Sequence, residues 1–180
     1  MDDSQLNSKN GIFHYHHEIG NHMKCFEFMA TVTVIALGLM VYMKMEAGVD
    51  VSGYFYLWVL VSLLPVLYVY FEYLRFNQLS VVLTIDTIRR NVTYSDVKTS
   101  VEFGFDEVKE IVLNRSPSWS RPDRVQMLPF EQFRYAKIFT QCSSITITSL
   151  LVRDLEKAID EIGCPKLVYQ TRLFPSIAME

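Results

Sequence analysis

The four histidines of the chain lie within nine residues near the amino terminus, a density that can produce a metal site. On a helix, His14, Glu18 and His22 share one face at i, i+4 spacing, and His17 lies beside His14. Imidazole and carboxylate ligands suit zinc or another divalent metal. Gly20 disfavours a rigid helix in this stretch. Two interpretations stay open: a metal or haem site formed by His14, His17, Glu18 and His22, and a solvated arm ahead of the membrane, which we favour.

A second cluster combines arginine with tryptophan in and beside a proline-containing stretch over residues 116–129. Both residue types are enriched at the centres of protein interfaces, and both suit an anionic membrane surface. Nearby Asp123 and Glu131 reduce the positive charge. We predict a contact with a protein partner or with lipid; the alternative is a solvated loop whose tryptophan packs back on its own domain. The residues of this cluster are Arg115, Trp119, Arg121 and Arg124.

No residue pattern indicates catalysis. Nucleophilic catalysis by Ser or Cys needs a base, and the chain beyond residue 22 contains no histidine. The acidic pairs Asp106–Glu107 and Asp160–Glu161 are adjacent, so on a strand they point to opposite faces and on a helix they are solvated. The three cysteines are widely separated, and neither a P-loop nor a dinucleotide glycine pattern occurs. We therefore predict no enzymatic activity and no cofactor.

Two long apolar runs lie between the histidine cluster and the arginine–tryptophan cluster, and they decide where both clusters lie relative to a membrane. The run from Val51 to Phe71 holds 21 residues without a charge, enough to cross a hydrocarbon core of about 30 Å as a helix. The run from Phe28 to Met43 has 16 uncharged residues and spans fully only if its flanking charged residues extend toward the headgroups. A short connection makes the helices antiparallel, so we predict a transmembrane hairpin with helices at about 26–45 and 51–73.

Positive charge near the runs predicts the orientation. Lys9 and Lys24 precede the first run and Arg75 follows the second, whereas the connection holds only Lys44, next to Glu46. Positive residues favour the cytoplasmic side. We expect a multi-pass protein of the inner (cytoplasmic) membrane with both termini in the cytoplasm.

The chain after the hairpin is rich in predicted strands. Alternating and β-branched residues predict strands at about 81–85, 91–94, 101–105, 108–113, 134–140 and 144–150. A helix is predicted from Val152 to Ile162, with Gly163 and Pro165 as its stop signals. We divide the chain into a polar, His-rich arm (1–25), the hairpin (26–73), a cytoplasmic domain (80–163) and a tail (164–180).

The segment from Val101 to Ile111, an aromatic-x-aromatic strand followed by two acidic residues, precedes a strand at 145–150 and one closing amphipathic helix. This order, placed beyond a two-helix hairpin, resembles the bacterial pleckstrin-homology-like (PH-like) domain over about residues 80–163. The resemblance implies an α+β membrane protein whose head is a small, partly open antiparallel β-barrel capped by the helix. It implies no enzyme activity. Phosphoinositide binding does not transfer with it, because no dense Lys/Arg pocket is visible.

Our leading hypothesis is a non-enzymatic membrane protein whose PH-like domain binds or scaffolds proteins at the inner membrane. One alternative is a metal- or haem-binding membrane enzyme or sensor that uses the histidine cluster. Another is an accessory subunit of a transporter. The expected partners are the lipid bilayer and a protein partner or a second copy of the chain. Nucleic acid is excluded, because the net charge is −3 and phosphate binding needs a basic surplus.

Overall fold

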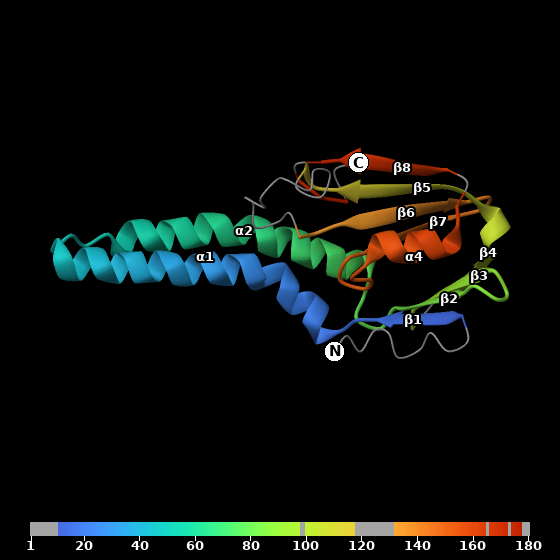
Figure 1. Ribbon diagram of the computed structural model, residues 1–180, viewed down its shortest axis with the longest axis horizontal. Coiled ribbons are helices and arrows are strands. Elements are labelled where there is room, and N and C mark those ends of the chain that lie inside the picture. Colours follow the sequence, from blue (N-terminus) through green and yellow to red (C-terminus); the bar gives the residue numbers. More distant parts are fainter. Residues whose placement is uncertain (1–10, 98–99, 118–131, 165, 173, 178–180) are drawn as a thin grey trace.

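A long helical hairpin extends from a head of strands in the computed structural model, which describes residues 11–97, 100–117, 132–164, 166–172 and 174–177 (Figure 1). Its elements are β1 (Ile12–His16), α1 (Ile19–Glu46), α2 (Ser52–Phe76), β2 (Val82–Asp86), β3 (Asn91–Ser95), β4 (Ser100–Gly104), the 3-10 helix η3 (Phe105–Glu107), β5 (Val108–Arg115), β6 (Tyr135–Thr140), β7 (Ser144–Thr148), α4 (Leu155–Ile162) and β8 (Leu167–Thr171). We call all of these except α1 and α2 the head.

The first sheet contains β1, β2, β3 and β4 in that order, with every neighbouring pair antiparallel. Its edge strand β1 precedes the hairpin, and His16 at its end pairs with Val82 at the start of β2. The hairpin is therefore inserted between two adjacent strands of one sheet. The expected polar arm over 1–25 is wrong for its described part, because residues 12–16 form a strand that pairs with β2, and α1 begins at Ile19.

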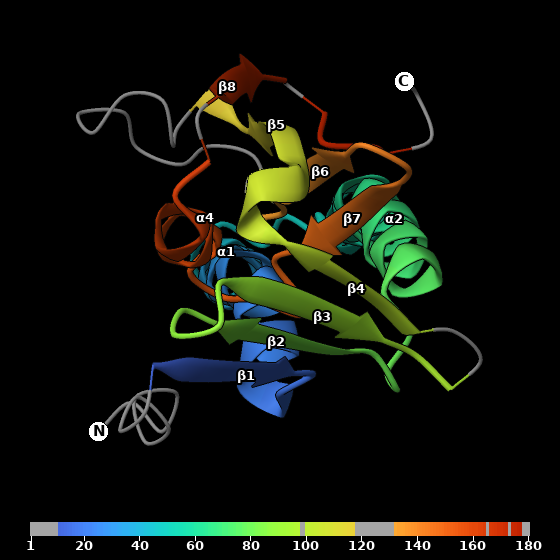
Figure 2. The same cartoon turned by 90° about the vertical axis from the view of Figure 1, so that its right-hand side faces the viewer.

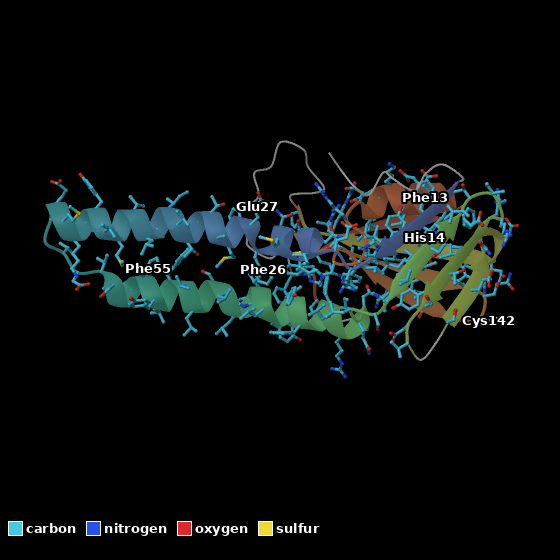
Figure 3. All side chains as sticks on the ribbon, turned by 90° about the horizontal axis from the view of Figure 1, so that it is seen from below. Phe13, His14, Phe26, Glu27, Phe55 and Cys142 are labelled. Carbon is cyan, nitrogen blue, oxygen red and sulfur yellow. The ribbon has the colours of Figure 1, made fainter. Side chains whose placement is uncertain are left out.

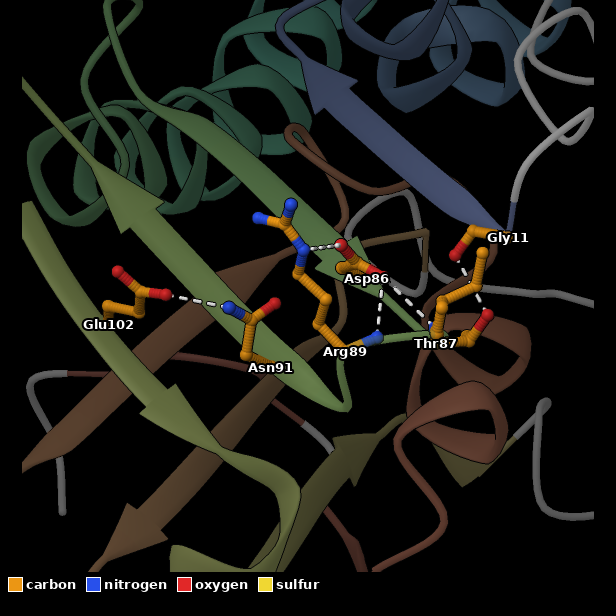
Figure 4. A network of polar contacts seen from close by, with 7 residues as sticks. Gly11, Asp86, Thr87, Arg89, Asn91 and Glu102 are labelled. Atoms are coloured by element: carbon orange, nitrogen blue, oxygen red, sulfur yellow. Dashed lines mark hydrogen bonds and ion pairs between the residues drawn. The ribbon is translucent and has the colours of Figure 1, made fainter.

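The end of the head away from the hairpin is closed by a polar network around the turn between β2 and β3 (Figure 4). The Asp86 carboxylate accepts hydrogen bonds from the main-chain N–H groups of Ile88 and Arg89 at 3.0 and 2.9 Å. Thr87 donates from both its main-chain N–H and its hydroxyl to the Gly11 carbonyl, each at 2.8 Å. Gly11 has a φ of +68°, and a Cβ there would lie 2.7 Å from the hydroxyl oxygen of Thr87. Glycine thus lets β1 enter the sheet at this point.

The second sheet has the order β7-β6-β5-β8. The pairs β5–β6 and β6–β7 are antiparallel, but β8 runs parallel to β5, with Ile111 opposite Leu167. Helix α4 carries the chain back before β8 begins, as a parallel connection requires. Two predictions are corrected here. The strands of the expected small, partly open antiparallel barrel form two separate sheets that do not close into a barrel, and one strand pair is parallel. The part of the expected tail over 167–171 is a strand of the head.

The main core lies between the two sheets, with α4 along one open side (Figure 2). It is built from buried apolar side chains of the six strands β2–β7 and of α4, and partly buried residues of β1 and β8 pack against it. Leu83, Ile111 and Leu113 are fully buried. Helix α4 ends as predicted at Gly163, which adopts a φ of +64° and donates its N–H to the carbonyls of Ile159 and Asp160.

A second, smaller core joins the hairpin to the head, and we call it the joint. It contains Cys25, Met29, Val66, Val69, Tyr73, Phe133, Tyr135, Leu150 and Ile177. One face of the last turns of α2 therefore packs on the head, as do the first turns of α1. Beyond the joint the two helices extend away from the head and lie side by side (Figure 1).

Two stretches of these helices, Cys25–Glu46 and Ser52–Phe76, are long and apolar enough to cross a membrane. Most of their side chains are not covered by protein, because only 11% of the most apolar 18-residue stretch of each helix is buried. A core helix of a water-soluble protein would bury its apolar face. The exposed apolar surface of both helices thus calls for another apolar environment.

Candidate functional site at the base of the hairpin

The strand directions bring several predicted features to the hairpin end of the head. Strand β2 leaves the hairpin, and each antiparallel step reverses the chain, so β5 runs toward the hairpin and ends there at Arg115. The connection from β5 to β6 therefore starts and finishes beside the joint, as does the link between β7 and α4 (Figure 1). Side chains at this end face both the hairpin and any surface that the hairpin enters.

Asn77, directly after α2, connects the hairpin to both sheets. Its side-chain Nδ2 donates to the Thr146 carbonyl on β7 at 2.9 Å and to the Tyr94 hydroxyl on β3 at 3.0 Å. Its Oδ1 accepts from the Thr148 N–H at 2.7 Å. Asn77 is fully buried, so these bonds replace water completely. The end of α2 is thereby held at a fixed place against both sheets.

The segment 174–177 holds α2 from the other side. The Tyr73 hydroxyl donates to the Pro175 carbonyl at 2.9 Å, and the Ser176 hydroxyl donates to the Glu72 carboxylate at 3.0 Å. Phe174 stacks on Tyr68 with ring centroids 6.2 Å apart. This part of the predicted tail is therefore bound to the hairpin, and its buried Ile177 belongs to the joint.

Two histidines and a tyrosine form a hydrogen-bonded chain between the helices. His17 Nδ1 lies 3.2 Å from His22 Nε2, and His22 Nδ1 lies 3.0 Å from the Tyr70 hydroxyl on α2. Burial lowers the pKa of both histidines below 6.5, and His22 lowers that of His17 further. Both rings therefore favour the neutral form. They line a cavity of about 370 Å³ together with Ile19 and Leu79.

The structure separates the four predicted metal ligands. His14 lies on β1, where its Nδ1 is 3.0 Å from the Thr84 hydroxyl, so the helical spacing assumed for His14, Glu18 and His22 is wrong (Figure 3). Glu18 precedes the first turn of α1, and only His17 and His22 meet. Across the described part of the chain, no group of three or more His, Cys, Asp or Glu side chains is placed to hold a metal.

A polar cavity of about 220 Å³ lies between α1 and the link that leads to α4. Its buried Arg134 pairs with Glu156 at 2.6 Å and donates to the Arg153 carbonyl at 2.9 Å. Asp154 also lines the cavity, so acidic groups balance the two arginines. The arrangement fixes the start of α4 rather than presenting a net positive pocket. From the sequence, Arg134 begins the predicted strand over 134–140 and is a possible further member of the arginine–tryptophan cluster. Its pairing with Glu156 was not predicted, because that partner lies 22 residues away on another element.

Of the predicted arginine–tryptophan cluster, Arg115 is described and Trp119, Arg121 and Arg124 lie outside the described residues. The Arg115 guanidinium carbon lies 4.3 Å from the centroid of the Tyr169 ring on β8. This cation–π contact joins the end of β5 to an edge strand of the second sheet. Tyr169 is about half exposed. This contact was not predicted, because no local residue pattern indicates that β8 lies next to β5.

The comparisons with known proteins agree with this geometry. A family model described as a PH domain matches residues 14–158, which includes β1, the hairpin, β2 to β7 and the first half of α4. No curated protein and no solved structure matches the chain. The match begins inside β1, as expected if that strand belongs to the domain and the hairpin is an insertion within it. The chain belongs to the PH domain family.

Proposed function

We propose that this protein is an integral protein of the inner membrane whose PH domain is a non-enzymatic module that binds a protein partner at the cytoplasmic face. PH domains are typically binding modules for proteins or lipids. The hairpin supplies the membrane anchor, and its two apolar helices have the required length. A scaffold of this kind needs a defined orientation more than it needs a reactive group.

The observation that carries this proposal is the joint. A domain that was tethered only through a flexible linker would sample many orientations. Here both helices are continuous with adjacent strands, and Asn77 bonds the end of α2 to both sheets. The segment 174–177 adds a further contact from the carboxyl-terminal side. These contacts support a head that presents one face to a partner at a fixed distance from the bilayer.

The proposed partner surface is the end of the second sheet next to the hairpin. Arg115 and Tyr169 stack there, and arginine and tyrosine are residue types enriched at interface centres. The edge of β8 also offers main-chain groups to an added strand. Trp119, Arg121 and Arg124 follow Arg115 in the chain and remain part of the proposal.

Cross-linking in intact membranes tests partner binding. The full chain is cross-linked, purified in mild detergent and analysed by mass spectrometry, beside an Arg115→Ala/Tyr169→Ala variant. Lys109→Ala is the matched control, because Lys109 is an exposed cation at the opposite end of β5. We expect a stoichiometric partner that the double variant loses and the control keeps. A head that cross-links to no other protein would contradict the proposal.

Cys142 tests the orientation. It is the exposed cysteine in the turn between β6 and β7, far from the hairpin, whereas Cys25 is buried in the joint (Figure 3). In a Cys164→Ser background, a membrane-impermeant maleimide should label inverted membrane vesicles and spare intact spheroplasts. Labelling of intact spheroplasts would place the head on the opposite side of the membrane. Release of the protein from membranes by alkaline carbonate would show that the hairpin is not a membrane anchor.

A further inference from the structure

Several large apolar side chains stay exposed where the head flanks the hairpin. They belong to the first turns of α1, the last turns of α2 and the residues just beyond α2, and Ile19 is 80% and Phe71 63% exposed. The others are Met23, Tyr68, Phe76 and Leu79. Exposed apolar side chains therefore occur on both helices at the level of the head as well as along the hairpin. An exposed apolar surface of this kind marks contact with a membrane or a partner.

A groove of about 640 Å³ lies on the outer face of α2 within this surface. Its lining comes from consecutive turns of the helix: Tyr68, Phe71, Glu72, Arg75 and Phe76. The opposite face of the same turns is packed into the joint through Val69 and Tyr73. The groove is therefore presented outward by a segment of helix that the head holds in place.

The groove has an apolar wall and one available cation. Glu72 is largely buried and accepts a hydrogen bond from Ser176, whereas Arg75 is exposed at the last turn of α2. Within the described residues Arg75 forms no ion pair. Guanidinium groups bind phosphate through two parallel hydrogen bonds, and aromatic side chains favour the boundary between acyl chains and headgroups.

We propose that this groove binds a phospholipid, with its phosphate on Arg75 and an acyl chain across Tyr68 and Phe71. The inference rests on the proposed membrane anchoring and deepens it. It places the headgroup layer at the level of Arg75, so that the head is seated against the bilayer. The groove suits lipid better than a second copy of the chain, because the one carboxylate among its described lining residues, that of Glu72, is buried and not open to the Arg75 of another copy.

Native mass spectrometry of the full chain in mild detergent tests the headgroup contact. The probe is phosphatidylglycerol, compared with a diacylglycerol glycolipid that carries no phosphate. Arg75→Gln should weaken phosphatidylglycerol binding about fivefold, the effect of one surface arginine, and leave the glycolipid unchanged. Arg89→Gln is the control, because Arg89 is an exposed arginine at the far end of the head. Equal binding by wild type and Arg75→Gln would overturn the proposal.

Phe71→Ser and inorganic phosphate separate a lipid site from a simple anion site. Phe71→Ser should lower phosphatidylglycerol binding, and millimolar inorganic phosphate should fail to displace the lipid. Displacement by phosphate with no effect of Phe71→Ser would overturn the acyl-chain part. A change from dimer to monomer in Arg75→Gln without loss of lipid would assign the groove to a second copy and overturn the proposal. Carbonate extraction of the same variants tests membrane anchoring separately. A failure of the lipid-binding proposal can therefore be distinguished from a failure of the proposed membrane anchoring.

Discussion

The two cores of this molecule are held together by different chemistry. The core between the sheets is centred on buried apolar side chains, and the hydrogen bonds of the buried Asp86 and Thr140 side chains stay within turns at the end away from the hairpin. The joint has an apolar centre of similar kind, but fully buried Asn77 and Ser176 and the hydroxyls of Tyr73 and Tyr135 make hydrogen bonds around it. Apolar burial is non-directional, whereas hydrogen bonds require a defined geometry. The difference indicates that the first core supplies the stability of the head and the joint supplies its orientation.

The comparison predicts the largest loss of stability for a truncation in the main core. Leu113 on β5 is fully buried, and Leu113→Ala removes apolar area and leaves a cavity, at a cost of about 3 kcal/mol in the free energy of unfolding. Thermal unfolding of the purified full chain in mild detergent measures this loss. Val97→Ala, at a residue that is 81% exposed, is the control and should change the stability little. Equal losses in the free energy of unfolding for Leu113→Ala and Val97→Ala would contradict the placement of Leu113 in the main core.

Asn77→Ala should separate orientation from stability. The variant loses two donated hydrogen bonds and leaves the Thr148 N–H without its acceptor, which costs about 2 kcal/mol. It should also broaden the distance between a spin label on Cys142 and one introduced at Val49 near the hairpin tip. Leu113→Ala should not broaden that distance in molecules that remain folded.

Asn91→Ala is the matched control for this change. The Asn91 amide donates to Glu102 at 2.6 Å on an exposed face of the first sheet, away from the joint. Its loss should affect neither the distance distribution nor the stability by much, because water replaces an exposed hydrogen bond. If Asn77→Ala kept the narrow distribution of the wild type, the orienting role of the joint would be refuted.

Local patterns were sufficient to predict most of the head but little of the joint. Alternating residues located the strands, and Gly163 marked the end of α4. The membership of β1 and β8 depends on pairing with strands about 70 and 56 residues distant, which no local pattern reports. Asn77 looked like an ordinary residue after a helix. Its function comes from the meeting of β3 and β7 at that point, a property of the assembled sheets.

The two tyrosine hydroxyls of the joint predict a graded effect on segment 174–177. Tyr73→Phe removes a hydrogen bond of 2.9 Å to Pro175, and Tyr135→Phe removes a longer one of 3.4 Å to Ser176. We expect a loss of about 1 kcal/mol for the first and less for the second. Hydrogen exchange of the carboxyl-terminal peptide should rise in the same order. A larger effect for Tyr135→Phe would show that packing, and not these bonds, holds the segment.

The histidine chain predicts a small dependence of the joint on pH. Because burial lowers the pKa of His17 and His22, the unfolded chain binds protons that the folded chain does not as pH falls below about 6.5. The free energy of unfolding should therefore be constant above pH 7 and decrease toward pH 5. Both rings are partly exposed, so the change should stay below about 1 kcal/mol.

The groups around His17 and His22 are consistent with a free energy of unfolding that decreases as the pH falls. The charge of His16 on β1 lowers the His17 pKa further, and Tyr70 faces His22 from α2. The carbonyls of Asn77 and Gln78 oppose the lowering of the His17 pKa without reversing it. If both rings are protonated, both nitrogens of the His17–His22 contact carry hydrogen and that bond is lost. His17→Gln/His22→Gln should flatten the profile, whereas His14→Gln on the edge strand should leave it unchanged. A profile that followed His14 instead would locate the titration in the sheet rather than in the joint.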